Sequence, residues 1–212
     1  MSECIVVGEI ETNCWIHPYK ENYCMVVDPG GDAEKIVSSL NKLKLIPSHI
    51  ILTHGHFDHL AAVPDLIKAF NHKIEICIHS LEANYLGMDS LKLHHESIIR
   101  AGGSPAFIDA LWKGLPEADI ILEEGSIIGP IKVLHLPGHS RGSIALYDEK
   151  AGLLFSGDTL FKANWGRTDL PGGSESKIYD SLKRLLSMDQ KIKVCPGHGD
   201  STTIKDEQGL IS

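Results

Sequence analysis

The segment 53–64, THGHFDHLAAVP, concentrates side chains that ligate metals directly after an apolar run. Within six positions it carries His54, His56, Asp58 and His59. The preceding residues 49–52, HIIL, have the composition of a buried strand. Imidazole and carboxylate groups at the end of a buried strand must be paired or solvated. Their concentration here therefore indicates a site that uses them together.

Three further donors follow other apolar runs in the same manner. His139 follows the run 131–136 in LPGHS, Asp158 follows 153–156 in FSGDT, and His198 follows 192–195 in CPGHG. In layered α/β proteins, loops meet around a site at the ends of strands, so we expect these side chains to converge on the first four. Imidazole and carboxylate ligands without thiolate suit zinc, with iron or manganese as alternatives.

The number of donors favours two divalent ions over one. Seven donors exceed the four ligands of a closed structural zinc site, whereas two open sites that share one carboxylate and a water fit the count. Two ions about 3.5–4 Å apart lower the pKa of a bound water, polarise a carbonyl and hold the leaving group. The pattern therefore predicts a hydrolase that needs no serine or cysteine nucleophile.

The elements that carry these donors can be placed from the spacing of apolar residues. Strands are expected at 4–8, 12–17, 23–28, 49–52, 74–78, 131–136, 143–147, 153–156 and 192–195, and helices at 32–43, 60–70, 81–86 and 174–188. DEKAG at 148–152 predicts a hairpin turn. The mixed segment 84–114 is expected to form helical pieces of a cover that selects substrate. With no repeat or linker, one domain over residues 1–212 is favoured.

Composition narrows the class of protein. The chain has 212 residues, of which 42% are hydrophobic, and a net charge of -8 without a cluster of lysines and arginines, so nucleic acid is not an expected partner. No basic leader precedes an apolar segment, and no apolar run reaches the roughly 18 residues of a membrane helix. A cytoplasmic protein without membrane contact is expected, and its oligomeric state stays open. The five cysteines are expected to be buried thiols in a reducing compartment: Cys4, Cys14, Cys24, Cys77 and Cys195.

Several motifs occur in a fixed order along the chain: NCW at 13–15, VVDPGG at 26–31, THGHFDH, PGHSRGS, SGDTLF, GRTDLPGG and PGHGDSTTI. This order resembles the metallo-β-lactamase superfamily, and specifically its short glyoxalase II-like hydrolases. The resemblance implies an α/β fold, the αββα four-layer sandwich. It implies that one metal is held by His54, His56 and His139, the other by Asp58, His59 and His198, and that Asp158 bridges them. Asp58 would also orient the attacking hydroxide between the metals.

The resemblance implies hydrolysis of a thioester, or a related acyl bond, of a small molecule. Glyoxalase II itself has a C-terminal helical domain with basic residues that grip glutathione, whereas this sequence ends fourteen residues after His198, which disfavours glutathione. The motif GRTD at 166–169 also resembles persulfide dioxygenases, which use a single iron, so this oxidoreductase is an alternative, as is a lactonase. True β-lactamases are disfavoured because many have a cysteine where this chain has Asp158. A purely structural role for the metals is disfavoured because a chain of this length has a sufficient core without them.

Residues around the donors are candidates for supporting roles. Lys162, Trp165 and Arg167 are candidate substrate-binding residues, since the two cations could hold an anionic substrate. Thr53, Ser140 and Thr159 flank ligands and could anchor imidazoles. The histidines outside the motifs are interpreted as ordinary core or surface residues, with His79 and His135 as possible exceptions: His17, His49, His72, His79, His94, His95 and His135.

Overall fold

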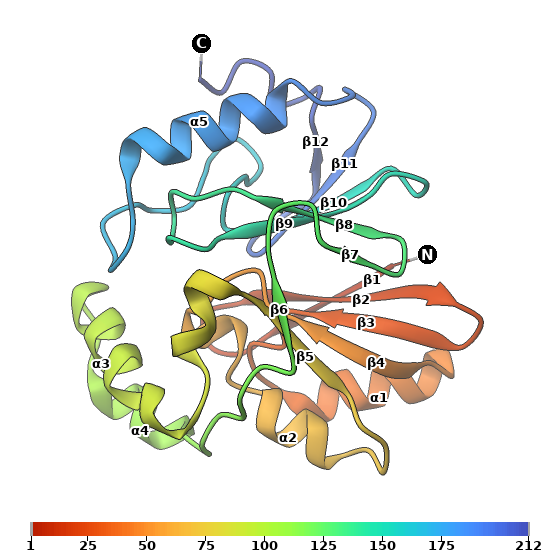
Figure 1. The fold of residues 1–212 in the computed structure, drawn as a ribbon, viewed down its shortest axis with the longest axis vertical. Coiled ribbons are helices and arrows are strands. Elements are labelled where there is room, and N and C mark those ends of the chain that lie inside the picture. The colour runs from red at the N-terminus through yellow and green to blue at the C-terminus, as the bar shows by residue number, and fades with distance from the viewer. Residues whose placement is uncertain (1, 212) are drawn as a thin grey trace.

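The computed structural model describes residues 2–211. Within this range the chain forms twelve strands, five α-helices and three short 3-10 helices. The strands make two six-stranded sheets that lie face to face, with helices on the two outer faces (Figure 1). None of the helices in residues 2–211 is both long and apolar enough to cross a bilayer.

The first sheet runs in sequence order from β1 to β6. Its members are β1 (Glu3–Val7), β2 (Thr12–Lys20), β3 (Tyr23–Val27), β4 (Ile46–Ile51), β5 (Glu75–His79) and β6 (Ile120–Leu122). The first three strands pair antiparallel, and β3 to β6 pair parallel. Parallel neighbours need crossover connections, which are supplied by α1 (Ala33–Leu43) and α2 (Val63–Lys68), and by the segment between β5 and β6.

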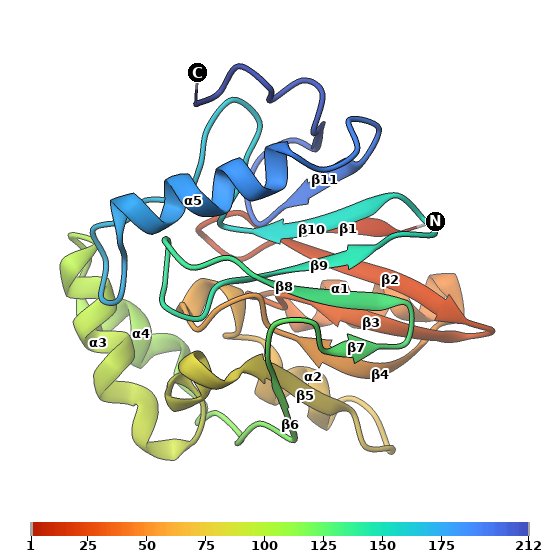
Figure 2. The ribbon, with the colours of Figure 1, turned by 45° about the horizontal axis from the view of Figure 1, so that its top comes forward.

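The second sheet has the order β12, β11, β10, β9, β8, β7. Its members are β7 (Ile127–Ile128), β8 (Ile131–His135), β9 (Ile144–Asp148), β10 (Leu153–Gly157), β11 (Lys193–Pro196) and β12 (Thr202–Thr203). The expected turn at 148–152 joins β9 to β10, which pair antiparallel. Helix α5 (Glu175–Leu186) connects the parallel neighbours β10 and β11 and covers the outer face of this sheet (Figure 2).

Alternation along the strands produces three apolar layers. In β3, Cys24 and Val26 pack toward α1 and α2, whereas Met25 and Val27 pack between the sheets. In β8, Val133 faces the space between the sheets, whereas Leu134 points to the opposite face and packs in a third apolar layer, beneath α5. Because successive side chains of a strand point to opposite faces, each sheet can bury both faces. One apolar layer lies between the two sheets, and one lies between each sheet and its outer helices. This arrangement confirms the expected αββα sandwich.

The structure corrects several expectations about individual elements. The helix expected at 81–86 is the 3-10 helix η2 (Ser80–Tyr85). The helix expected at 60–70 is the shorter α2, and η1 (Phe57–His59) precedes the expected range. Strands β6, β7 and β12 were not expected, because two or three residues are too few to show a period. Four cysteines are buried, but Cys4 is exposed on β1, the edge strand of the first sheet.

The segment 84–114 is helical over much of its length. It contains η3 (Met88–Ser90), α3 (Leu91–Arg100) and α4 (Pro105–Leu111). These helices pack on each other and project from the end of the first sheet, next to the loops that follow β4 (Figures 1 and 2). This position places the segment beside the donors of the THGHFDH motif.

Candidate metal centre

Loops that follow strands of both sheets bring the predicted donors together. The first group consists of His54 and His56, which follow β4, and His139, which follows β8. His139 Nε2 lies 2.8 Å from His56 Nδ1 and 3.2 Å from His54 Nε2. All three side chains are buried. Three imidazole nitrogens from two different sheets therefore meet at one point.

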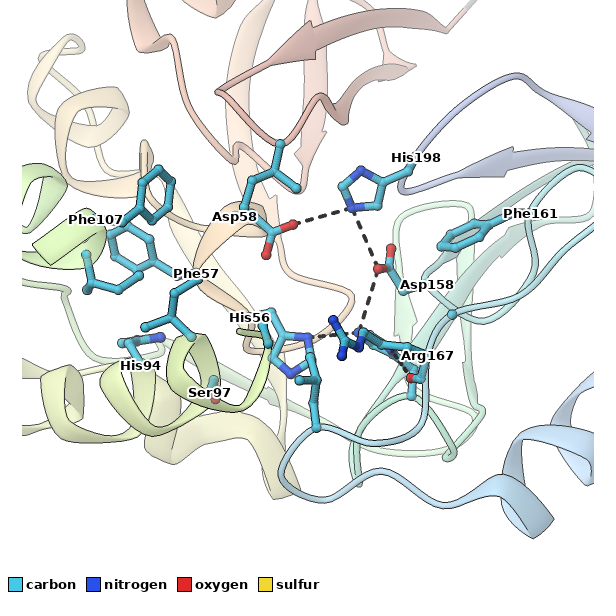
Figure 3. Close-up of a pocket in the computed structure, with 17 residues that line it drawn as sticks. His56, Phe57, Asp58, His94, Ser97, Phe107, Asp158, Phe161, Arg167 and His198 are labelled. Carbon is cyan, nitrogen blue, oxygen red and sulfur yellow. Dashed lines mark hydrogen bonds and ion pairs between the residues drawn. The ribbon is translucent and has the colours of Figure 1, made fainter. Parts of the chain in front are cut away.

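The second group consists of Asp58, His59 and His198, with Asp158 between the two groups (Figure 3). His198 Nε2 lies 3.2 Å from His59 Nε2 and 3.3 Å from Asp58 Oδ2. Asp158 follows β10, and its Oδ1 is 3.4 Å from His59 Nε2 while its Oδ2 is 3.6 Å from His139 Nε2. One carboxylate thus reaches both groups, as a shared ligand must.

Hydrogen bonds from outside the cluster determine which nitrogen carries the proton in four of its five imidazoles; the exception is His56, whose Nε2 is buried without a hydrogen-bond partner in residues 2–211. Thr53 Oγ1 donates to Asp28 Oδ2 at 2.7 Å, so it accepts the Nδ1–H of His54 at 3.1 Å. Asp28 Oδ2 also accepts the Nδ1–H of His59 at 3.0 Å. Because a neutral imidazole has one N–H, the Nε2 lone pairs of His54 and His59 point into the cluster.

Backbone carbonyls have the same effect on His139 and His198. The Nδ1–H of His139 donates to the carbonyl of Arg167 at 2.8 Å, and that of His198 donates to the carbonyl of Glu11 at 3.3 Å. Their Nε2 lone pairs therefore also point inward. Anchoring the outer nitrogen of each ring in this way is typical of imidazoles that ligate metals.

These donors fit metal ions. The inward lone pairs of His54 and His139 lie 3.2 Å apart, as do those of His59 and His198, so a proton or a metal ion must lie between the members of each pair. Asp158 Oδ1 is buried and accepts no hydrogen bond within residues 2–211. Such lone pairs are costly to bury without a cation. The chain therefore contains a metal-binding cluster of histidines and aspartates.

The charges of the cluster favour cations. Burial lowers the pKa of His59, but the carboxylates of Asp158, Asp58 and Asp28 outweigh it and raise that pKa to about 10 when no metal is bound. Burial and the neighbouring imidazoles hold the pKa of His54 well below its usual value. The carboxylates of the cluster thus attract positive charge. The ring of His54 stays neutral, and an imidazole must be neutral to bind a metal ion.

Two glycines allow the ligand loops to pack so closely. A Cβ on Gly55 would lie 2.4 Å from the ring of Tyr85, and a Cβ on Gly30 would lie 1.7 Å from the carbonyl oxygen of Asp58. Gly55 separates His54 from His56, so the ring of Tyr85 supports the loop from the side of the 84–114 segment. A side chain at either glycine would displace the donors.

Sequence reasoning missed two carboxylates that hold the ligand loops. Asp28 directly follows β3 and accepts hydrogen bonds from the backbone and hydroxyl of Thr53 as well as from His59. Its position after a buried strand is the same signal that identified the other donors. Glu82, on η2, is buried, and its two oxygens accept the N–H groups of Gly55 at 3.0 Å and Gly142 at 2.7 Å. Nothing in the sequence distinguishes Glu82, because it acts only between loops far apart in the chain.

Replacing Glu82 by glutamine is expected to weaken metal binding by roughly 10–100-fold. The amide keeps one acceptor oxygen, but its NH2 group faces a backbone N–H, so either the loop of Gly55 or that of Gly142 loses its partner. The dissociation constant for Zn²⁺ or Co²⁺, measured by competition with a chromophoric chelator, tests this. Asp148→Asn is the matched control: its carboxylate is also buried, accepts an N–H of Ala151 and contacts His17, but it lies at the far end of β9. An equal loss of affinity in both variants would show general destabilisation instead.

A cavity of about 270 Å³ opens on the cluster. Both Asp58 and Asp158 line it, and so does Arg167, one of the three candidate substrate-binding residues. Arg167 forms a two-pronged ion pair with Asp169, with distances of 2.7 and 2.8 Å. The cavity thus joins the metal-binding cluster to solvent.

The other candidate residues lie outside the lining of this cavity. Lys162 pairs with the exposed Asp200 at 3.0 Å. Trp165 packs against Tyr179 in the apolar layer under α5. Both side chains therefore make contacts that hold the loop after β10, rather than contacts with the cavity.

The supporting polar residues differ in what they contact. Thr53 anchors a ligand, as described, whereas Ser140 hydrogen-bonds Ser143 at 2.7 Å. Thr159 Oγ1 is buried without a hydrogen-bond partner in residues 2–211. His79 and His135 stack on each other, with ring centroids 4.3 Å apart, rather than on a donor.

Comparison with known proteins extends over nearly the whole chain. A family model described as the Metallo-beta-lactamase superfamily matches residues 7–198, a range that contains all seven donors. A hydroxyacylglutathione hydrolase of Haemophilus influenzae is 31% identical, over 97% of this chain and 94% of that protein. The solved structure of the B3 metallo-beta-lactamase BLEG-1 has a TM-score of 0.83 at 33% identity, covering 99% of this chain and 97% of that one. TTHA1623, solved in a di-iron-bound form, has a TM-score of 0.80 at 34% identity, covering 97% and 96%.

Proposed function

The chain belongs to the metallo-beta-lactamase superfamily, and we propose that it is a binuclear metal-dependent hydrolase that cleaves thioesters of small molecules. The observation that carries this proposal is the convergence of four inward imidazole lone pairs and two carboxylates at the floor of an open cavity. An open cavity is what distinguishes a catalytic metal site from a closed structural one.

Two groups of donors support the binding of two ions. The first would be held by His54, His56 and His139, and the second by Asp58, His59 and His198, with Asp158 shared. Bound divalent ions would supply Lewis acidity toward a carbonyl and would lower the pKa of water near neutrality. Zinc suits these ligands, and iron is a further candidate because a similar protein was solved with two irons.

The side chains of this chain would orient the reactants. Asp58 lines the cavity, and its Oδ2 accepts the hydroxyl of Thr12 at 3.4 Å. This carboxylate is positioned to hold the attacking water by a hydrogen bond and to take its proton. Asp58 and Asp158 are therefore our candidate catalytic residues, and no serine or cysteine nucleophile is involved.

The thioester assignment is supported by the name of the Haemophilus influenzae relative, a hydroxyacylglutathione hydrolase. The likeness to a B3 metallo-beta-lactamase makes β-lactams a second class of substrate to test. The alternative of a mononuclear iron persulfide dioxygenase rests on GRTD, whose Arg167 lines the cavity. A lactonase would use the same carbonyl chemistry.

Metal analysis combined with a substrate panel tests the proposal. Protein loaded with Zn²⁺, Fe²⁺ or Mn²⁺ is analysed for metal content and then assayed anaerobically with thioesters, lactones and a β-lactam, and aerobically with a thiol persulfide. We expect two ions per chain and anaerobic thioester cleavage that a chelator abolishes. One iron per chain with oxygen consumption on the persulfide would replace the hydrolase assignment with the oxidoreductase. A preference for the lactone or the β-lactam would reassign the substrate.

A further inference from the structure

One wall of the cavity beside the metal-binding cluster is apolar. It is formed by Phe57 on η1, Ile98 and Ala101 at the end of α3, and Phe107 and Ile108 on α4. Figure 3 shows Phe57 and Phe107 on the side of Asp58 that lies away from His198 and Arg167. Any substrate that places a carbonyl at the cluster can therefore extend one of its substituents along this wall.

The polar residues beside the apolar wall, His94 and Ser97, add no charge to this side of the cavity. The Nε2–H of His94 donates to the carbonyl of Tyr85 at 2.9 Å. Burial lowers the pKa of His94 to about 4, so its ring is neutral near neutral pH. A charged substituent on this side would meet no counter-charge and would pay the cost of desolvation.

The opposite side of the cavity also offers little to an anion. Arg167 is the only lysine or arginine that lines the cavity within residues 2–211, and its guanidinium is already paired with Asp169. Anionic thiol carriers such as glutathione need cations, and this chain has a net charge of -8. The thiol part therefore has no strong anion site here, and the apolar wall is available to the acyl part.

We propose that the wall formed by Phe57, Ile98, Ala101, Phe107 and Ile108 is an acyl-binding subsite for apolar acyl groups. This inference rests on the proposed hydrolase function and specifies its substrate class: thioesters of unsubstituted aliphatic or aromatic acids, rather than the polar hydroxyacyl group of a hydroxyacylglutathione. The residues that decide this preference come mostly from the 84–114 segment, which the sequence also indicated as a cover.

The test varies the acyl group while the thiol stays constant. Acetyl, butanoyl, hexanoyl and lactoyl thioesters of N-acetylcysteamine are assayed with the metal-loaded protein, together with lactoylglutathione. We expect kcat/KM to rise by roughly fourfold per added methylene until the wall is covered, as transfer of a methylene from water predicts. The lactoyl compounds are expected to be poorer substrates than butanoyl, because their hydroxyl would lose water against the apolar side chains of the wall.

A matched pair of variants locates the subsite. Ala101→Trp fills the wall and is expected to lower kcat/KM for the hexanoyl thioester by at least about tenfold while acetyl changes little. Ile99→Trp is the control, because Ile99 lies two residues earlier on α3, is 57% exposed and does not line the cavity. Thioester hydrolysis without dependence on chain length, a preference for lactoyl compounds, or equal effects of both variants would overturn the subsite and leave the hydrolase proposal standing.

A binding measurement separates failure of the subsite from failure of the proposed reaction. The neutral amide hexanamide is titrated into the metal-loaded wild type and into both variants by calorimetry, with lactamide as comparison. We expect hexanamide to bind the wild type and the Ile99→Trp variant, and to bind the Ala101→Trp variant at least about tenfold more weakly. If no thioester is cleaved but this binding pattern holds, the hydrolase assignment fails and the apolar subsite stands. If hexanamide binds no better than lactamide, the subsite is excluded whatever reaction the protein catalyses.

Discussion

Replacing Asp158 by alanine is expected to reduce turnover by about 10³-fold and to lower the metal content from two ions to one or none. The reason is its position: its carboxylate lies within 3.4 Å of His59 and 3.6 Å of His139, so both donor groups lose the ligand that they share. Elemental analysis and steady-state kinetics with the best thioester of the panel test this.

The fold of the Asp158→Ala variant is expected to survive. Asp158 Oδ1 accepts no hydrogen bond within residues 2–211, and the buried ring of His59 keeps the carboxylates of Asp28 and Asp58 as partners when Asp158 is removed. Circular dichroism and thermal unfolding of the metal-free proteins check this. Asp200→Ala is the control, since it removes an exposed carboxylate near His198 that lies outside the cavity. Near-normal turnover of the Asp158 variant would exclude a shared metal ligand at this position.

Replacing Asp58 by asparagine is expected to lower turnover by roughly 10²–10⁴-fold while leaving one ion bound. Asp58 lies 3.3 Å from His198 and 3.5 Å from His59, but it is not part of the first group of donors. The variant should therefore lose the second ion and the base that orients the attacking water. Metal titration, followed by removal of excess metal by gel filtration and elemental analysis, gives the stoichiometry, and kcat gives the catalytic loss.

A neighbouring carboxylate controls for the change of charge. Asp65, seven positions later, pairs with Lys113 and does not line the cavity of the cluster, so Asp65→Asn should bind two ions and turn over normally. Loss of both ions in the Asp58 variant would show that the two groups do not bind metal independently. Wild-type turnover in that variant would remove Asp58 from the catalytic residues.

Much of this protein could be predicted from its sequence because the relevant signals are local. Apolar alternation located nine of the strands, and the sharp change from an apolar run to histidine or aspartate identified the seven donors. The chain turns where a strand ends, and the two sheets lie face to face, so donors at strand ends of either sheet can meet at one end of the sandwich. His54 follows β4 of the first sheet and His198 follows β11 of the second, 144 residues apart. The order of the motifs was enough to indicate the superfamily, which the family model confirms.

Other features were decided only by tertiary structure, because they depend on which distant loops touch. Glu82 is an unremarkable acidic residue in the sequence, yet folding buries it between the loops of Gly55 and Gly142. Lys162 and Arg167 are both cations on the loop after β10, but only Arg167 lines the cavity. The apolar wall combines η1 with α3 and α4, and its lining cannot be read from any one segment. Residue type and strand position are enough to indicate the candidate metal donors. The contacts that support these donors and line the cavity arise from packing between distant elements, which no local pattern predicts.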